Sequence, residues 1–485
     1  MDATWGDAEG DAFRDECGVF GIFGRQDAAA IVTLGLHALQ HRGQEAAGIV
    51  SFDGQQFHVE RHVGLISDNF TNPSIIARLP GGRAIGHTRY STTGGAGLRN
   101  VQPLFAELAD GGFAVAHNGN ITNALTIQRR LQQDGAIFSS TSDTETIMHL
   151  VATSREKDFN AKFIDAARQL EGAFSLVALS SKKMIGCRDP LGIRPLVLGD
   201  LDGTWILASE TCALDIIGAR YVRDVKPGEM VIVTGRGIDS LFPFEPVKPR
   251  FCVFEYVYFA RPDSQIEGRN VYAVRKQIGA ELALEHPVDA DLVVPVPDSG
   301  VPAAIGFAQQ AGLPFELGII RNHYVGRTFI QPSDSIRHMG VKLKHNANRR
   351  ILDGKRVVLV DDSIVRGTTS QKIVQMVREA GAREVHMRIA SPPTRSSCYY
   401  GVDTPETAKL LASRMSIAEM ADFIRVDSLG FPSIDGLYRA AGEARRDADA
   451  PQFCDACFTA QYPTRLTDHD GADNVRTLSV LASNG

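Results

Sequence analysis

One stretch, residues 357–370 with the sequence VVLVDDSIVRGTTS, constrains the fold more than any other part of the chain. Its apolar residues 357–360 predict a buried strand of a parallel sheet, and a short loop separates them from a helical run at about 371–380. Asp361 and Asp362 stand at the carboxyl end of that strand. Because ligands of open α/β sheets bind beyond the carboxyl ends of the strands, this order predicts a ligand site.

The loop after the acidic pair contains small and hydroxyl-bearing residues: Ser363, Gly367, Thr368 and Thr369. At a helix start, such a loop offers backbone N–H groups, hydroxyls and a positive dipole end to a phosphate. The acidic pair can hold two vicinal hydroxyls or an outer-sphere divalent metal. A polar turn at a sheet edge is the alternative, but strand, acidic pair, loop and helix occurring in order favour a site for a phosphorylated sugar with Mg²⁺.

This stretch resembles the phosphoribosyl pyrophosphate (PRPP) signature of the type I phosphoribosyltransferases. The resemblance implies a set of PRPP-binding residues: Asp361, Asp362, Ser363, Arg366, Gly367, Thr368 and Thr369. The turn PDSG (297–300) resembles the pyrophosphate loop of the amidophosphoribosyltransferases, which implies that Ser299 joins the acidic pair in contacting Mg²⁺. The basic segment 321–350 is either a solvated surface or a lid. Within it, NHYVGRTFIQP resembles the family's flexible PRPP loop, which implies a PRPP contact for Arg327.

Composition limits the remaining possibilities. The chain has 485 residues, of which 44% are hydrophobic and 22% charged, so two globular domains with a tail are expected. The net charge of −6 argues against a general nucleic-acid binder. No apolar run approaches the ~20 residues that cross a bilayer, and the acidic residues 1–16 resemble neither a signal nor a transit peptide. We therefore expect a cytoplasmic protein without membrane contact, whose seven cysteines are thiols or metal ligands.

The first half of the chain alternates short strand-like runs with glycine-punctuated loops, which predicts an α+β sandwich. Its polar candidates lie in these separate loops: Arg42, Arg89, Asn118, Gly119 and Asp143. An arginine can bind a carboxylate in bidentate fashion, an aspartate can pair with an ammonium group, and amide groups can stabilise an oxyanion. These residue types suit an amino-acid substrate. Cys17, taken alone, is more typical of a small buried hydrophobe.

The segments CGVFG, HRGQ, GHTRYSTTG, HNGNI and SDTE resemble the N-terminal-nucleophile (class II) glutamine amidotransferases. The resemblance implies that Cys17 attacks the glutamine amide, forms a thioester and releases ammonia, with Asn118 and Gly119 as the oxyanion hole. It also implies glutamine-binding residues: Arg42, Gly43, Arg89, Thr92 and Asp143. In that family the mature chain begins with the cysteine, whose α-amino group is the general base. Residues 1–16 would then be a propeptide cleaved between Glu16 and Cys17.

A proline-rich stretch, PFEPVKP (243–249), reads as an extended linker between two domains. The second half alternates predicted helices (271–285, 301–311) with predicted strands (291–296, 315–320). The resulting division is a propeptide at 1–16, a class II glutamine amidotransferase domain at 17–243, an α/β type I phosphoribosyltransferase domain at 244–425, and a helical, cluster-binding segment at 426–485.

Four cysteines are candidate metal ligands: Cys252, Cys398, Cys454 and Cys457. The last two form a C-x₂-C chelate, and spacing alone fits a zinc site as well as an iron–sulfur cluster, with a redox dithiol as a weaker choice. The surrounding segments CDACFTAQYP and FCVFEYVYFARPDS resemble the cluster-bearing branch of the amidophosphoribosyltransferases, which implies a 4Fe–4S cluster.

Together the resemblances cover nearly the whole chain after residue 16 and imply an amidophosphoribosyltransferase. Glutamine, PRPP and water would give 5-phosphoribosylamine, glutamate and pyrophosphate, the first committed step of purine nucleotide synthesis. Purine nucleotide monophosphates would be allosteric feedback inhibitors, and a homotetramer would be the assembly. The rival interpretations are a non-catalytic PRPP or nucleotide sensor and an amidotransferase with another acceptor.

Overall fold

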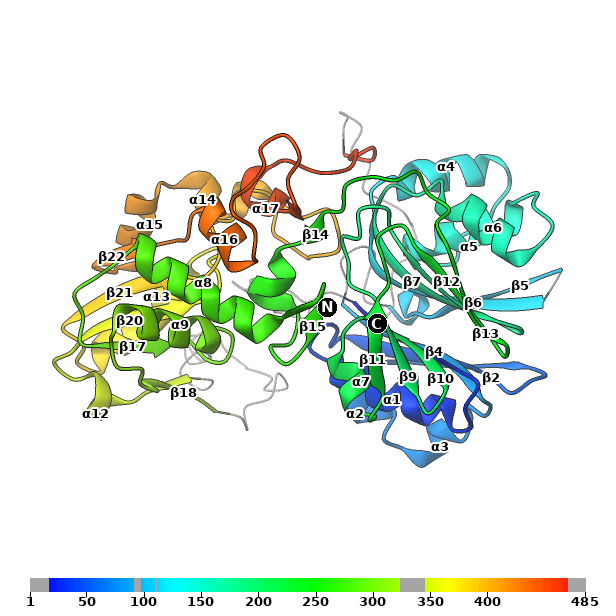
Figure 1. Cartoon of the computed structure of the whole chain (residues 1–485), viewed down its shortest axis with the longest axis horizontal. Helices are drawn as coiled ribbons and strands as arrows, with labels where there is room; N and C mark the ends of the chain where they lie inside the picture. Colours follow the sequence, from blue (N-terminus) through cyan, green and yellow to red (C-terminus); the bar gives the residue numbers. More distant parts are fainter. Residues whose placement is uncertain (1–16, 91–96, 110, 323–344, 470–485) are drawn as a thin grey trace, which may run out of the picture.

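The structure, a computed structural model, describes residues 17–90, 97–109, 111–322 and 345–469. The described chain forms two halves that lie side by side (Figure 1). The first half is a sandwich of two antiparallel sheets, and the second is built on a parallel sheet.

Within the described residues, the first sheet has seven strands in the order β11, β9, β10, β1, β4, β2 and β3. In that order they span Arg220–Asp224, Val197–Leu201, Thr204–Ala208, Gly18–Phe23, Arg83–Arg89, Ala46–Phe52 and Phe57–Val63. The second sheet there has six strands in the order β13, β12, β8, β7, β6 and β5. These span Gly237–Leu241, Met230–Thr234, Met184–Arg188, Gly172–Ser180, Gly111–Ile121 and Leu104–Leu108.

Helices cover the outer face of each sheet, which gives four layers (Figure 1). The first sheet is covered by α1 (Ala28–Ala38), α2 (Ile66–Asn69), α3 (Pro73–Ile76) and α7 (Cys212–Asp215). The second is covered by α4 (Ala124–Gln133), α5 (Thr144–Thr153) and α6 (Phe159–Ala167), and η1 (Leu98–Asn100) is a short 3₁₀ turn.

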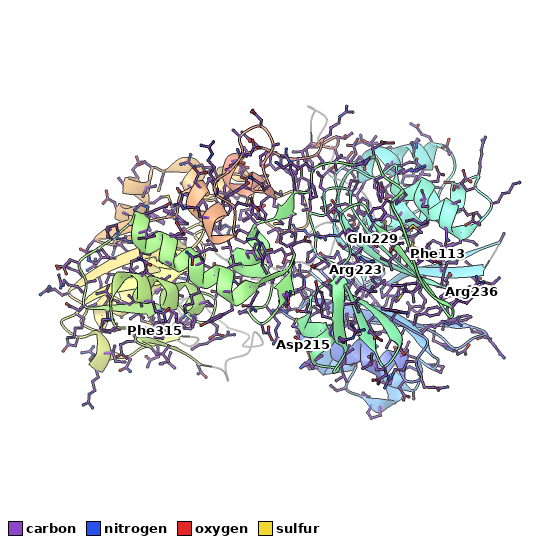
Figure 2. The ribbon with its side chains drawn as sticks, in the orientation of Figure 1. Phe113, Asp215, Arg223, Glu229, Arg236 and Phe315 are labelled. Atoms are coloured by element: carbon purple, nitrogen blue, oxygen red, sulfur yellow. The ribbon has the colours of Figure 1, made fainter. Side chains whose placement is uncertain are left out.

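Apolar side chains from both sheets fill the space between them, including Val19, Ile85 and Val177. In the outer layer Phe113 of β6 packs 5.5 Å, centroid to centroid, from Phe159 of α6, and Figure 2 shows Phe113 within this half. Two packed sheets with helices on both outer faces are the α+β sandwich that the strand pattern predicts.

The sheet of the second half holds β17 (Leu292–Pro295), β20 (Arg356–Asp361), β21 (Glu384–Ile389) and β22 (Ser428–Gly430), all parallel. Alternate residues of β20 enter two different cores, with Val358 and Val360 on one side and Val357 and Leu359 on the other. Burial on both faces explains why this strand reads as an unbroken apolar run.

Helices α8 (Val271–Glu285) and α9 (Val301–Ala311) cover one face, and α13 (Thr368–Glu379) and α15 (Ile417–Ile424) cover the other. Glycines let α8 and α9 cross closely: a Cβ on Gly279 would lie 1.9 Å from the carbonyl oxygen of Ala303. The remaining elements are short: β15 (Gln265–Ile266), β16 (Arg269–Asn270), β18 (Ile319–Arg321), β19 (His345–Ala347), α12 (Arg349–Leu352), η3 (Thr407–Lys409), α14 (Leu411–Arg414), α16 (Ile434–Ala440) and α17 (Ala456–Thr459).

The two halves are joined by more than the linker. Residues 243–249 lie outside regular structure, as the proline-rich stretch predicts. After them come β14 (Phe251–Cys252), which pairs in parallel with β23 (Phe453–Cys454), and the π-helical turn η2 (Glu255–Phe259). The C-terminal part of the chain therefore folds back to the point where the chain enters its second half.

Two predicted boundaries were wrong. The predicted strand 315–320 is only an isolated bridge at Phe315, because Pro314 and Gly318 interrupt the run, and β18 pairs instead with β19. The helix after the acidic pair starts at Thr368 rather than near 371, since Gly367 takes the left-handed conformation that ends the loop. Among the described residues no helix has the length and apolar character to cross a membrane.

Candidate active sites

Cys17 stands directly before β1, in the interior of the first sheet between β10 and β4. Its side chain is buried, and its thiol donates a hydrogen bond to the carbonyl oxygen of Tyr90 at 3.6 Å. Gly18 pairs with Thr88 across the β1–β4 ladder, so the end of β4, with Arg89, lies beside the thiol. The candidate nucleophile is therefore held at the end of a rigid strand.

Arg89 is 4% exposed. Burial lowers the pKa of its guanidinium, while the nearby groups Cys17, Glu45 and Asp143 favour its charged form. The loop after α1 touches the same strand end, because a Cβ on Gly43 would lie 2.6 Å from the backbone nitrogen of Arg89. Only glycine fits there, and the approach places a cationic group where a substrate carboxylate can be bound.

Asn118 and Gly119 lie on β6, in the sheet that faces the nucleophile strand. Asn118 is fully buried, and neither polar atom of its side chain has a hydrogen-bond partner among the described residues. Gly119 has a φ of 142°, and a Cβ there would lie 2.0 Å from the carbonyl oxygen of Ala173. Because a buried amide is normally hydrogen-bonded, Asn118 is well suited to receive a ligand group.

His87 links β4, which carries Arg89, to β6, which carries Asn118. Nε2–H of His87 on β4 donates to the carbonyl oxygen of His117 on β6 at 3.0 Å. Burial lowers the pKa of His87 to about 3, so the ring is neutral at physiological pH. This bridge fixes the Arg89 end of β4 relative to the Asn118 end of β6.

Asp143 precedes α5 and is 9% exposed. Its Oδ2 accepts a hydrogen bond from the backbone amide of Ile121 at 3.0 Å and lies 3.6 Å from Nδ1 of His117. Burial opposes ionisation, yet His117 and this amide hold the pKa of Asp143 below its ordinary value. An ionised, buried carboxylate near Arg89 is suited to pair with the ammonium group of an amino acid.

Arg42 belongs to a buried ion network. Its Nε donates to the carbonyl oxygen of Cys17 at 3.2 Å, and its terminal nitrogens bind Glu210 at 2.5 Å and Glu255 at 2.6 Å. Arg194 reaches the same Glu255 at 3.3 Å. The side chains of all four ionic residues are fully buried. Arg42 thus holds the nucleophile backbone rather than presenting its guanidinium to solvent.

Sequence reasoning missed Glu210, Glu255 and Arg194. A signal existed for Glu255, which is the only charged residue in the apolar run CVFEYVYF at 252–259. A buried charge in such a run needs a partner, and here the partners come from the first half of the chain.

In the second half, Asp361 ends β20 and Asp362 follows it, both 8% exposed. Ser363 donates its hydroxyl to Asp362, and Ser299 also bonds that carboxylate. Burial raises the pKa of Asp362 above its ordinary value. The structure therefore brings the turn 297–300 to the acidic pair, as the resemblance implies. The turn can lie this close to β20 because residue 300 is a glycine: a Cβ there would lie 2.4 Å from the carbonyl oxygen of Val360.

The loop after the pair leads into α13 through Gly367, which has a φ of 81°. Thr368 is exposed at the first helical position, and Arg366 and Thr369 are half-buried. Hydroxyls and first-turn amides therefore lie next to the acidic pair, which is the arrangement for binding a phosphate. Two expected contacts, Arg327 and Thr92, lie outside the described residues.

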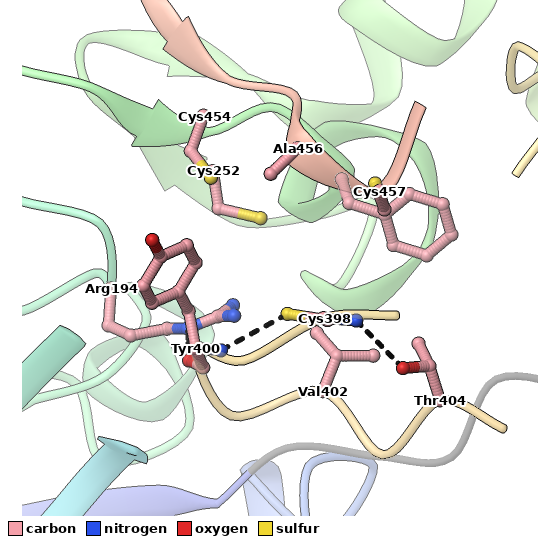
Figure 3. A pocket seen from close by; sticks show the side chains of 10 residues that line it. Arg194, Cys252, Cys398, Tyr400, Val402, Thr404, Cys454, Ala456 and Cys457 are labelled. Atoms are coloured by element: carbon pink, nitrogen blue, oxygen red, sulfur yellow. Dashed lines mark hydrogen bonds between the residues drawn. The ribbon is translucent and has the colours of Figure 1, made fainter. Parts of the chain in front are cut away.

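A cavity near the joint of the two halves is lined by all four candidate ligands: Cys252, Cys398, Cys454 and Cys457 (Figure 3). The β14–β23 pairing places Cys252 opposite Cys454. Backbone amides of Arg395 and Ser396 donate to the carbonyl oxygen of Cys457, which fixes the C-x₂-C turn against the loop of Cys398. The fold thus gathers residues that are remote in sequence.

The protonation of these thiols bears on what they can bind. Burial raises the pKa of Cys454 to about 12, and burial together with the other three thiols raises that of Cys457. Thiolates in such a place need a compensating cation. No group of three or more His, Cys, Asp or Glu side chains within the described ranges is arranged to hold a single metal ion.

The sequence matches two families of known domains. Residues 87–215 match the glutamine amidotransferase domain, and residues 269–405 match the phosphoribosyl transferase domain. The amidophosphoribosyltransferase of Rhizobium etli is 61% identical over 98% of this chain and 97% of its own length. That of Bacillus subtilis is 47% identical over 95% of this chain and 96% of its own length.

Two solved structures superpose on nearly the whole chain. A glutamine PRPP amidotransferase from B. subtilis, complexed with ADP and GMP, covers 93% of this chain and 98% of its own, with 46% identity and a TM-score of 0.88. A structure described as the allosteric regulatory enzyme of purine biosynthesis covers 96% of this chain and 100% of its own, with 45% identity and a TM-score of 0.90.

Fold and sites define a class II glutamine amidotransferase joined to a type I phosphoribosyltransferase. The chain belongs to the amidophosphoribosyltransferase family. It is a transferase of the first step of purine nucleotide synthesis, which joins glutamine nitrogen to PRPP.

Proposed function

We propose that Cys17 hydrolyses glutamine and that the acidic-pair site adds the released ammonia to PRPP. The observation that carries the first part is Asn118, a fully buried amide whose polar atoms have no partner among the described residues. The thiolate of Cys17 attacks the side-chain carbonyl carbon of glutamine. The oxyanion that forms accepts hydrogen bonds from Nδ2–H of Asn118 and N–H of Gly119.

Glutamine is oriented by charge at its other end. Arg89 binds the α-carboxylate and Asp143 binds the α-ammonium group, while Arg42 and Gly43 shape the loop beside the nucleophile. Thr92 completes this set. Collapse of the oxyanion expels ammonia and leaves a thioester on Cys17, which water then hydrolyses to glutamate.

The acidic pair serves the acceptor half. Asp361 and Asp362 bind the ribose hydroxyls, and the loop with Ser363, Arg366, Gly367, Thr368 and Thr369 binds the 5-phosphate. Arg327 is a further PRPP-binding residue. Oxygen donors of Asp361, Asp362 and Ser299 suit Mg²⁺, a hard cation, and an adjacent pair of buried carboxylates favours a counter-ion. When bound, Mg²⁺ would neutralise charge on the departing pyrophosphate.

The test is stoichiometry. Purified enzyme given glutamine and PRPP should release glutamate and pyrophosphate in equal amounts, and omission of PRPP should leave only slow glutamate release. Binding of PRPP without pyrophosphate release would support the sensor alternative. Glutamate release that ignored PRPP would support a different acceptor.

We further propose that residues 1–16 are a propeptide removed to expose the α-amino group of Cys17. An amide nitrogen bonded to Glu16 is not a base, whereas an α-amino group with a pKa of about 8 can take the thiol proton at neutral pH. Intact mass of the active enzyme should correspond to a chain that begins at Cys17. Full activity in a chain that still carries residues 1–16 would overturn the assignment of the base.

The cysteine cavity is suited to a 4Fe–4S cluster. Four thiols line this one cavity, and four thiolates are a ligand set for either a zinc ion or a 4Fe–4S cluster. The resemblance of the surrounding segments to the cluster-bearing branch of the family favours the cluster.

Metal analysis tests the cluster. Anaerobic protein should contain about four irons per chain. Cys457→Ser should lose iron and lower the melting temperature, since metal binding is coupled to folding. Cys212→Ser, outside the cavity, should keep its iron. Stoichiometric zinc without iron would contradict the proposal.

We extend the proposal to regulation and assembly. The solved relatives are described as a complex with ADP and GMP and as an allosteric enzyme, which supports inhibition of this chain by purine nucleotide monophosphates. We place the enzyme in the cytoplasm as a homotetramer. Inhibition by GMP or AMP and a tetramer mass in sedimentation are the expected results, and an uninhibited monomer would contradict both.

A further inference from the structure

We propose that residues 399–401, a loop of the phosphoribosyltransferase half, position the oxyanion hole of the glutaminase half. Gly401 and Asn120 are the positioning residues. The inference rests on the proposed role of Asn118 and Gly119, and it adds a control on that site by the other half of the chain.

The first observation is a backbone-to-backbone contact. Gly401 has a φ of 115°, and a Cβ there would lie 3.1 Å from both Cα and the carbonyl carbon of Gly119. Gly119 has no room to retreat, because its own backbone lies against Ala173 on β7. Residues 399–401 therefore limit the position of the Gly119 peptide on the side that faces Gly401.

The second observation is a pair of hydrogen bonds across the same contact. Nδ2 of Asn120 donates to the carbonyl oxygen of Tyr399 at 2.9 Å, and Nε of Arg194 donates to that of Tyr400 at 2.8 Å. Two successive carbonyls of the loop thus accept from side chains of the glutaminase half. Asn120 is the residue after Gly119, so the bond acts directly on the strand that carries the oxyanion donors.

The loop itself is held from behind. The backbone amide of Tyr400 donates to Sγ of Cys398 at 3.3 Å, and that of Cys398 donates to Oγ1 of Thr404 at 2.8 Å (Figure 3). Tyr400 is 1% exposed, and its hydroxyl lies 3.0 Å from that of Thr464. A loop fixed on both sides transmits its position to what it touches.

The C-terminal segment holds Thr122, the residue directly after β6, in the same way. Oγ1 of Thr122 donates to the carbonyl oxygen of Arg465 at 2.9 Å, and the amide of Asp468 donates to the carbonyl of Thr122 at 3.0 Å. The His469 ring lies 4.4 Å, centroid to centroid, from that of Tyr399. The end of β6 is therefore held by two segments that are remote in sequence, residues 399–401 and residues 465–469. We call these contacts the clamp.

Such a clamp acts on the transition state more than on glutamine binding. Oxyanion donors act over about 2.7–3.1 Å, and misplacement by about 1 Å can lower a rate by about 10²-fold. Of the groups assigned to glutamine, Arg89 lies at the end of β4, whereas Asp143 bonds the amide of Ile121, one residue beyond Asn120. The oxyanion donor Gly119 is the group that residue 401 touches directly, so moving the loop should lower kcat of glutamine hydrolysis by a larger factor than it raises KM.

Gly401→Ala is the main test, because its methyl group would press on Gly119. We expect kcat for glutamine hydrolysis, at saturating PRPP, to fall by about 10- to 100-fold, with KM for glutamine within about twofold. Synthesis from ammonia and PRPP and the iron content should match those of the unmodified enzyme.

The matched control is Gly237→Ala, at a similar φ of 126° and with no atom within 4 Å of the added methyl group. It imposes the same backbone strain without the contact and should retain kcat. Asn120→Asp is the second variant, and it tests the positioning role of residues 399–401 if Gly401→Ala does not fold. It keeps the size of the side chain but sets an acceptor against the Tyr399 carbonyl, and it should lower kcat in the same selective way.

Asn118→Ala separates the inference from the function on which it rests. If Asn118→Ala lowers kcat but Gly401→Ala and Asn120→Asp do not, the clamp is wrong and the oxyanion assignment stands. If Asn118→Ala has full kcat, both are overturned. A rise in KM together with loss of ammonia-dependent synthesis in the loop variants would show general disruption and would also overturn the clamp.

Discussion

The two candidate sites differ in how the chain builds them. The glutaminase site lies where two packed sheets meet, and its key residues Arg42, Arg89 and Asn118 are between 0% and 4% exposed. The acceptor site lies at the carboxyl edge of one parallel sheet, where the acidic pair is 8% exposed but Ser299 and Ser363 are half-buried and Thr368 is exposed. The glutaminase site is buried because two sheets pack face to face around it. The acceptor site is formed by loops at the edge of a single sheet.

This difference suits the two chemistries. Free ammonia needs protection from bulk water, because ammonia that escapes becomes ammonium and loses its nucleophilic electron pair. PRPP is a large, charged substrate whose phosphates need accessible backbone amides and hydroxyls. The buried Arg42–Glu255 pair and the contact of residues 399–401 with β6 join the two environments.

The largest effect is expected at the acceptor site. Combining Asp361→Asn with Asp362→Asn should lower synthesis of phosphoribosylamine by more than about 10³-fold with either glutamine or ammonia, since metal and hydroxyl contacts are lost together. Slow glutamine hydrolysis should persist. Asp422→Asn, at an exposed carboxylate on α15, is the control and should be fully active. A double variant that still synthesises at the normal rate would show that the two sites are misassigned.

Glu255→Gln should have the next largest effect. Removal of this charge leaves Arg42 and Arg194 buried without one of their partners, which should lower the free energy of unfolding by about 3–5 kcal/mol. Glutamine hydrolysis should fall more than ammonia-dependent synthesis, because Arg42 holds the carbonyl of Cys17. Urea unfolding and paired assays measure both quantities.

A matched variant is Asp202→Asn, which breaks an exposed pair with Arg25 and should change stability by less than about 1 kcal/mol. Equal stability changes in the two variants would mean that the buried network does not couple the halves.

The last expected effect is absent at neutral pH and develops only as the solution is acidified. Burial lowers the pKa of His87 from 6.5 to about 3, so below pH 6.5 the unfolded chain binds a proton that the folded chain does not. This group's contribution to stability should therefore fall as pH falls from about 6.5 towards 3, by up to about 1.4 kcal/mol per pH unit. His87→Gln should have a shallower decline in unfolding free energy over that range. Identical slopes would contradict the burial of a neutral ring.

The sequence predicted the parts of each site that lie on one continuous stretch. Strand, acidic pair, loop and helix at 357–379 follow from a local order of residue types, and only the helix start was wrong. The four cysteines could be selected as candidates, but their approach depends on the pairing of β14 with β23, which the local pattern does not encode.

Contacts between the halves could not be predicted in the same way. The bond from Asn120 to Tyr399 spans 279 positions, and that from Arg42 to Glu255 spans 213. Neither partner carries a local signal for the other, since side-chain partners at such a distance are set by how the two halves pack. The division at 243/244 and at 425/426 and the roles of individual site residues stay predictions.

One pair of assays on Cys17→Ala tests most directly the claim that one buried site supplies nitrogen to a second, separate site. Synthesis of phosphoribosylamine is measured in one preparation, first with glutamine and then with a high concentration of ammonia. The account predicts that the glutamine-dependent rate falls to background while the ammonia-dependent rate stays at that of the unmodified enzyme. Loss of both rates, or survival of the glutamine-dependent rate, would contradict it.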